Sequence, residues 1–176
     1  MSIKKHKEIK CLINKIIKDH LQYSCAVNTL VKYTSKLDKN IIKEMSLRIT
    51  LINNIKDNRS YDTFVYLKEN EQVDDELLVK IAKLSFIDLI LNNKSNEAIT
   101  FAEKYFDNLS DKSLISLIGY TPEDNKHLNI LSLGIDRVEI MSLINSLLFK
   151  KSTGKSESLL HSTLSYYETL RNNKEM

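Results

Sequence analysis

The stretch FIDLILNNKSNEAITFAEKYF, residues 86–106, decides the fold class of this chain. Its apolar residues return at spacings of three and four, so it predicts two helices. The polar letters NNKS interrupt the apolar pattern and predict a turn between them. Just upstream, residues 77–91 carry apolar side chains around most of the helix circumference, a pattern typical of a helix that is packed on several sides. We therefore expect a central helix that ends near residue 91.

The same spacing recurs along the rest of the chain and predicts eight or nine helices joined by short turns. One proline and three glycines in 176 residues is a low content of helix breakers, and no segment predicts a strand. The expected fold class is therefore an all-α bundle. The expected helices cover approximately residues 9–20, 26–33, 41–56, 60–69, 77–91, 96–106, 114–120, 136–149 and 159–170, with a short turn starting at Thr121-Pro122.

Composition excludes few functions. The net charge of +3 permits contact with an acidic partner or with nucleic acid without requiring it. Neither a signal-peptide core nor an apolar run of about eighteen residues is present, so we expect a cytoplasmic protein, with the nucleus as a second location. Cys11 and Cys25 form no C-x-x-C motif, which favours buried thiols in a reducing compartment over a zinc site.

The stretch FKKSTGKSES, residues 149–158, looks like the end of a phosphate-binding loop. Such a loop requires a glycine five positions before Gly154 and a strand leading into it. Phe149 stands at that position, and the preceding VEIMSLINSLLF has helical spacing. The stretch is therefore interpreted as a solvated turn between two helices and not as a nucleotide site.

Catalytic groups do not form a recognisable set. Asp74 and Asp75 are adjacent, so on a helix they point about 100° apart, which suits capping better than shared acid–base work. His20 lies on the apolar stripe of its helix, which favours a partly buried packing role. We therefore expect that the protein is not an enzyme and that it binds no metal, cofactor or small-molecule substrate. The histidines occur singly, at His6, His20, His127 and His161.

Read as a series, these helices resemble the LisH–CTLH–CRA family, the scaffold modules of the CTLH, or glucose-induced-degradation, E3 ubiquitin-ligase complex. The middle carries the most specific likeness, since Glu97, Ala98, Phe101 and Ala102 match the family's E-A-x-x-F-A pattern after an apolar helix and a polar turn. The preceding LRITLINNIKDNRSYDTFVYL, residues 47–67, resembles the family's previous helix pair, with Asn58 where glycine is frequent.

The two ends of the chain extend the resemblance. The last third of the chain resembles the CRA segment, through SLISLIGY, Arg137, LINSLL with Asn145, and LLHSTLSYYETL. The stretch DNKHLN stands where the family has a serine-proline step. INKIIKDHLQYSCAVNTLVKY, residues 13–33, resembles a LisH helix pair. There Cys25-Ala26 replaces the family's glycine-tyrosine, which is expected to weaken the turn. The expected segments of one compact unit are 1–11, a basic extension; 12–35, LisH-like; 41–106, CTLH-like; and 107–171, CRA-like.

The resemblance implies a non-catalytic scaffold that binds other subunits carrying CTLH–CRA modules through helix–helix interfaces. The apolar stripes that would form these interfaces could equally pack inside the chain, and this alternative stays open. The candidate interface residues are Ile13, Ile16, Ile17 and Leu21 for LisH pairing, and Leu160, Leu164, Tyr167 and Leu170 for the C-terminal module.

A second hypothesis is a helical factor bound to the ribosome or another ribonucleoprotein. Lysines bind backbone phosphates without sequence specificity, and two basic stretches could do so. Against it, acidic and basic residues are nearly equal in number, 23 and 26. A helical interaction protein of another kind also remains open. The candidate RNA contacts are Lys4, Lys5, Lys7, Lys10, Lys150, Lys151 and Lys155.

Overall fold

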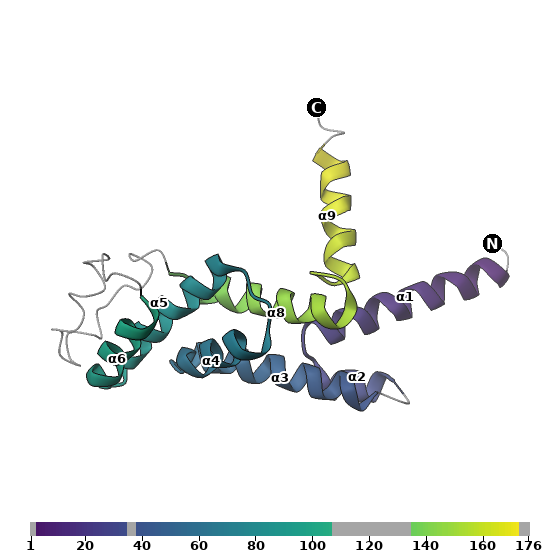
Figure 1. The fold of residues 1–176 in the computed structure, drawn as a ribbon. Helices are drawn as coiled ribbons and strands as arrows, with labels where there is room; N and C mark the ends of the chain where they lie inside the picture. Colours follow the sequence, from purple (N-terminus) through teal and green to yellow (C-terminus); the bar gives the residue numbers. More distant parts are fainter. Residues whose placement is uncertain (1–2, 35–37, 107–134, 173–176) are drawn as a thin grey trace. The chain divides into compact units, whose positions relative to one another are not determined.

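The computed structural model describes residues 3–34, 38–106 and 135–172 (Figure 1). Within these ranges every regular element is an α-helix, which confirms the all-α prediction. The expected helix at 114–120, the turn at Thr121-Pro122 and the DNKHLN connection lie outside the described residues. The helices are α1 (Ile3–Tyr23), α2 (Val27–Tyr33), α3 (Lys39–Lys56), α4 (Ser60–Asn70), α5 (Asp75–Leu91), α6 (Ser95–Tyr105), α8 (Arg137–Thr153) and α9 (Leu159–Asn172).

Two helices near the chain ends run further than predicted. Helix α1 begins at Ile3 and ends at Tyr23, because lysine and glutamate are good helix formers and allow extension beyond the apolar stripe. Helix α8 continues past Phe149 to Thr153, and Gly154 then stops it with a left-handed φ of 76°. The expected turn at residues 149–158 is therefore shorter than predicted.

The start of α8 resembles a capping box only in part. The Oδ1 atom of Asp136 accepts a hydrogen bond from the Val138 amide at 2.8 Å, as an N-cap residue should. The Glu139 carboxylate instead accepts one from the Lys80 ammonium at 2.9 Å. The acidic partner of the motif is thus used to join α8 to α5.

Contacts divide the chain into two compact units. Unit 1 comprises Met1–Ile49 and Asn145–Met176, and unit 2 comprises Thr50–Ile144. Both boundaries fall inside helices, α3 and α8, so each of these helices contributes residues to both units. The LisH-like, CTLH-like and CRA-like segment bounds stay a prediction, since they describe sequence likeness and not contacts.

Helix α5 is the core of unit 2, as its apolar circumference predicts. It packs against α4 on one side and α6 on another. Its side chains from Leu84 to Ile90 are all buried, polar ones included. Aromatic rings fill the space between α4 and α6, where Phe64 meets Phe101 and Tyr105 with ring centroids 5.2 and 4.9 Å apart. Burial all round therefore comes from neighbours on several sides.

A buried carboxylate links four helix segments of unit 2. Asp88 of α5 is 1% exposed and accepts hydrogen bonds from the backbone amide and the hydroxyl of Ser60, at the start of α4. Arg137, at the start of α8, forms an ion pair with the same carboxylate. The Arg137 guanidinium also donates to the Ile55 carbonyl at the end of α3, at 2.7 Å. This cluster supplies partners to backbone groups at the end of α3 and the start of α4.

Three of the turns that the structure describes use left-handed residues that are not glycine. Cys25, Asn58 and Asn93 have φ values of 54°, 57° and 60°. In each, the amide two positions beyond the helix cap bonds the carbonyl five residues back, as in Ala26 to Leu21 at 2.9 Å. Asn58 confirms the predicted turn. The turn at Cys25 keeps this geometry at a conformational cost of about 1–2 kcal/mol, so loss of the glycine does not remove it.

We expect Arg137→Met to destabilise unit 2 by about 3–5 kcal/mol, because it leaves the Asp88 carboxylate buried without a counter-charge. Urea unfolding followed by circular dichroism measures the loss. The matched control is Arg59→Met, since the Arg59–Asp57 pair is exposed on both sides and should contribute about 1 kcal/mol or less. Similar losses in the two variants would contradict a structural role for the buried pair.

Candidate protein-interaction surfaces

A buried arginine fixes the end of α1 in unit 1. Arg48 of α3 is fully buried, and its guanidinium donates to the carbonyls of Gln22 at 2.6 Å and Tyr23 at 3.1 Å. It also donates to Oδ1 of Asn145 on α8 at 2.9 Å, and it lies over the Phe149 ring, 5.3 Å from the centroid. These bonds satisfy the last carbonyls of α1 and hold that helix against α3 and α8.

Glu44 accompanies this arginine one turn earlier on α3, with a carboxylate–guanidinium distance of 2.5 Å. Burial raises the pKa of Glu44, while the charge and hydrogen bonds of Arg48 and a hydrogen bond from Ser152 act in the opposite direction. Burial likewise raises the pKa of the Cys25 thiol, which therefore stays protonated. Cys11, in contrast, is exposed, so the expectation of a buried thiol is wrong there.

The start of α9 is held by the last turn of α1. One oxygen of Asp19 accepts a hydrogen bond from the Leu159 amide at 2.6 Å, and the other pairs with the Lys155 ammonium at 2.8 Å. His20 is half-buried, as its place on the stripe predicts, and its Nδ1 lies 3.2 Å from the Ser158 hydroxyl. An acidic group at a helix N-terminus is favourable, so Asp19 both caps and orients α9.

Helix α1 carries a continuous apolar row that the described part of the chain does not cover. We call it the α1 stripe. Its members follow the i, i+3, i+4, i+7, i+8 spacing of one helix face. The stripe consists of Ile9, Leu12, Ile13, Ile16 and Ile17. Ile16 is half-buried, and the other four are exposed: Ile9 by 45%, Leu12 by 57%, Ile13 by 50% and Ile17 by 38%.

The predicted LisH residues thus fall in two environments. Ile13 and Ile17 are exposed, whereas Leu21 is half-buried, near the joint with α9. Ile9 and Leu12 were not among the predicted interface residues, although their spacing on the same face could have identified them. The role of these residues in binding a partner stays a prediction.

Helix α9 carries a second apolar row. Leu160 is half-buried, whereas Leu164 is 51% and Tyr167 67% exposed. The neighbouring Tyr166 is exposed as well, and the side chain of Leu170 lies outside the described residues. Apolar side chains one and two turns apart on a helix form a face that a partner helix can cover.

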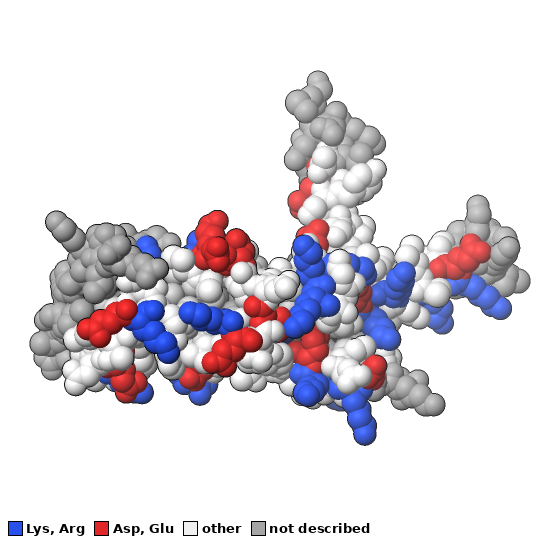
Figure 2. All heavy atoms as spheres, viewed as in Figure 1, with Lys and Arg blue, Asp and Glu red and all other residues white. Residues whose placement is uncertain are grey.

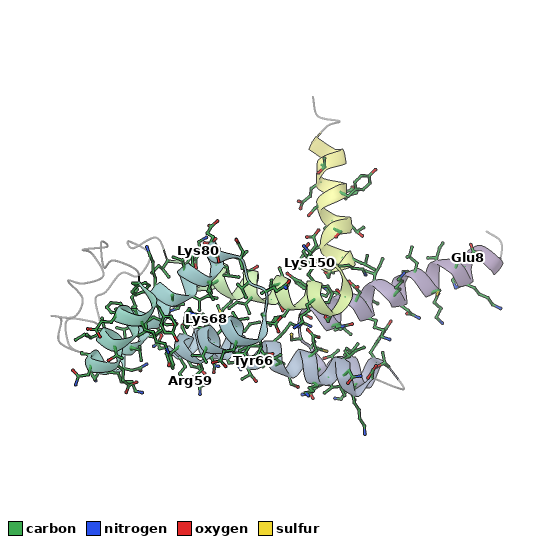
Figure 3. All side chains as sticks on the ribbon, in the orientation of Figure 1. Glu8, Arg59, Tyr66, Lys68, Lys80 and Lys150 are labelled. Carbon is green, nitrogen blue, oxygen red and sulfur yellow. The ribbon has the colours of Figure 1, made fainter. Side chains whose placement is uncertain are left out.

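Among the described side chains, the lysines of the ribonucleoprotein hypothesis include both exposed and paired ones. Lys7, Lys10 and Lys150 are exposed, and Figure 3 labels Lys150 near the end of α8. Lys155 is in an ion pair with Asp19. The side chains of Lys4 and Lys5 lie outside the described residues, and Lys151 is exposed and has an interaction partner. On the face shown in Figure 2, acidic side chains lie among the basic ones.

Unit 2 contains a hollow of about 390 Å³ between α4, α5 and α6. Its walls include Tyr61, Phe101 and Tyr105, whose rings also pack on one another. The ammonium of Lys68 lies 4.2 Å from the Tyr105 ring centroid, so the chain's own cation already uses an aromatic face there. In the described ranges, no group of three histidine, cysteine or acidic side chains could hold a metal ion.

In the part of the chain that the structure describes, all regular elements are helices, and apolar rows on α1 and α9 are exposed. The family described as CTLH/CRA C-terminal to LisH motif domain matches residues 15–172, and the chain belongs to this family. CTLH domains mediate protein–protein interactions and are generally non-catalytic. No curated protein and no solved structure matches the chain. No described helix combines the length and apolar character that crossing a membrane requires.

Arg48→Met is expected to destabilise unit 1 by about 3–5 kcal/mol, because the Glu44 carboxylate and two carbonyls of α1 lose their buried donor. Glu44→Gln should cost less, about 1–3 kcal/mol, because the glutamine amide oxygen can still accept from the guanidinium and the Glu44 side chain is 20% exposed. Urea unfolding of both variants tests this. A loss with Glu44→Gln as large as with Arg48→Met would mean that the ion pair, and not the carbonyl bonds, holds α1.

Proposed function

We propose that this chain is a non-catalytic scaffold that joins subunits of a CTLH-type E3 ubiquitin-ligase complex, in the manner of the small scaffold subunit of that complex. Membership of the CTLH/CRA family supports the class of function. The observation that carries the proposal is the α1 stripe, a row of five aliphatic side chains with four exposed. Its occupants would be subunits with related CTLH–CRA modules, in a hetero-oligomer.

Burial of the α1 stripe supplies part of the binding free energy. Fully burying one such side chain contributes about 1.5–3 kcal/mol, so covering the exposed parts of five contributes about 4–7 kcal/mol. Association itself costs about 4–15 kcal/mol. The stripe alone is therefore too small for a stable complex. A second surface must contribute, and the α9 row with Leu164 and Tyr167 is suited to this role.

Charged residues beside the stripe would set the orientation of the partner. Lys10, Lys15 and Lys18 of α1 are exposed. A partner helix with acidic side chains at the corresponding rim positions would pair with them in one register and be repelled in others. Aliphatic burial would then supply affinity, and the lysines would supply the choice of partner and register.

A native pull-down of the tagged protein from its own cells, with and without RNase and read by mass spectrometry, tests the assignment. Recovery of a RING subunit and CTLH relatives, unchanged by RNase, supports the ligase scaffold. Recovery of ribosomal proteins that disappear with RNase would replace it with the ribonucleoprotein function. We place the protein in the cytoplasm, with the nucleus as a second location, which cell fractionation in the same experiment measures.

Ile13→Asp should reduce recovery of the CTLH relatives at least tenfold, because it puts a charge in the middle of the α1 stripe. Val79→Asp is the matched control, since Val79 is 51% exposed on α5 in unit 2. Equal recovery with the two variants would show that the stripe is not an interface. Circular dichroism checks that both variants keep their helices.

Leu164→Asp tests the α9 row separately. We expect a loss of recovery similar to that with Ile13→Asp, because neither surface alone offsets the cost of association. The double variant should lose little more than either single variant if both surfaces bind one partner. Two additive losses, each affecting a different recovered protein, would instead assign the two surfaces to different subunits.

A further inference from the structure

Three groups converge on one buried hydroxyl where α9 meets α1. The Ser158 hydroxyl oxygen lies 3.2 Å from Nδ1 of His20, on α1, and 3.2 Å from Nδ1 of His161, on α9. It also accepts a hydrogen bond from the backbone amide of His161 at 3.3 Å, which makes Ser158 the N-cap of α9. Ser158 is fully buried, and the two imidazole centroids are 5.7 Å apart.

The number of protons in this arrangement is limited. A serine hydroxyl has one hydrogen to donate and two lone pairs to accept with. The His161 amide uses one lone pair of the Ser158 oxygen. Only one of the two imidazole Nδ1 atoms can therefore donate a hydrogen bond to the remaining lone pair. The second imidazole Nδ1 must then be bare in order to accept the serine hydrogen. A bare Nδ1 means a neutral ring, so the contact accommodates at most one charged histidine.

The helix termini favour a positive charge on one ring over the other. His20 lies in the last turn of α1, where the helix dipole favours a positive group. His161 lies in the first turn of α9, where the same effect disfavours one. These positions favour His20 as the donor to Ser158 and His161 as the acceptor. Protonation of His161 would place an N–H against an oxygen that has no free lone pair.

We propose that His20, Ser158 and His161 form a proton-sensitive latch that holds α9 on α1 and opens when the second imidazole becomes charged. His161 is exposed, so protons reach it from solvent. Histidine is the side chain that proteins use most often as a pH-dependent switch. The inference concerns the isolated chain and does not depend on the proposed ligase function.

Other charged groups around the latch act on it unequally. The Asp19 carboxylate, next to His20 on α1, supports a first positive charge, although Lys155 from the turn before α9 partly neutralises it. The Tyr23 ring of α1 contacts the His161 ring edge-to-face, with the ring centroids 5.4 Å apart. Arg48 of α3 donates a hydrogen bond to the Tyr23 carbonyl. Glu157, before α9, accepts a hydrogen bond from the Ser162 hydroxyl. The cations of Lys155 and Arg48 oppose a second imidazolium.

The bonds that survive protonation define the motion. The Leu159 amide still bonds Asp19, so the first residue of α9 remains attached to α1 while the contact at Ser158 is lost. Helix α9 would then pivot about its first turn. Such a pivot changes the direction in which Leu164 and Tyr167 of α9 point relative to α1.

Spin-label distances between α1 and α9 in the full chain test the latch. One label is attached to Cys11, which is exposed. The other is attached to a cysteine introduced on the exposed side of α9 by Ser165→Cys. Cys25→Gly removes the remaining thiol, at a left-handed position that suits glycine. Dilution with unlabelled protein removes distances between molecules. From about pH 7.5 to pH 5, we expect the population at the latched distance to fall by roughly half or more.

His161→Gln and His20→Gln, made separately, are the controls. Each variant can hold at most one imidazolium, so each should keep the latched distance at both pH values. Asp19→Asn keeps the oxygen that caps Leu159 and should keep the pH response, which excludes titration of Asp19 as its cause. An unchanged distance in the parent protein, or the same change in both histidine variants, would overturn the proposal.

Discussion

The carbonyl groups at the end of a helix need donors wherever they are buried, and in this chain arginine side chains supply them. Arg48 bonds the carbonyls that end α1, and Arg137 bonds one that ends α3. Each guanidinium also pairs with a carboxylate on a helix, Glu44 or Asp88. A charge buried in this way requires every partner to be present, so each cluster specifies one arrangement of helix ends within its own unit.

The fold class could be predicted from the sequence because few breakers and a period near 3.6 act locally, and α4, α5 and α6 begin and end close to the expected residues. Helix ends were predicted less well. The left-handed turn at Asn58 follows from asparagine's own tolerance. The left-handed turn at Cys25 could not be predicted from the residue type, because the surrounding hydrogen bonds impose its conformation. The end of α8 at Gly154 was missed because the apolar pattern stops one turn earlier.

The candidate surfaces were predictable as stripes, but whether a stripe is covered depends on the rest of the fold. Ile17 and Leu21 lie one turn apart on α1, yet the first is exposed and the second half-buried. Long-range polar contacts were not predictable. Nothing near Ser158 in the sequence indicates His20, which is 138 residues away. Arg48 resembles any surface arginine of an amphipathic helix until α1 and α8 are placed around it.

The discontinuity of unit 1 has a consequence for the order in which the protein can fold during synthesis. All residues of unit 2, Thr50–Ile144, leave the ribosome before Asn145 and Phe149, which complete the surroundings of Arg48. Domains generally fold as their residues emerge. The N-terminal helices therefore lack the α8 partners of Arg48 until α8 has been made. During that interval a chaperone or a partner already present would meet α1 before the chain's own C-terminus does.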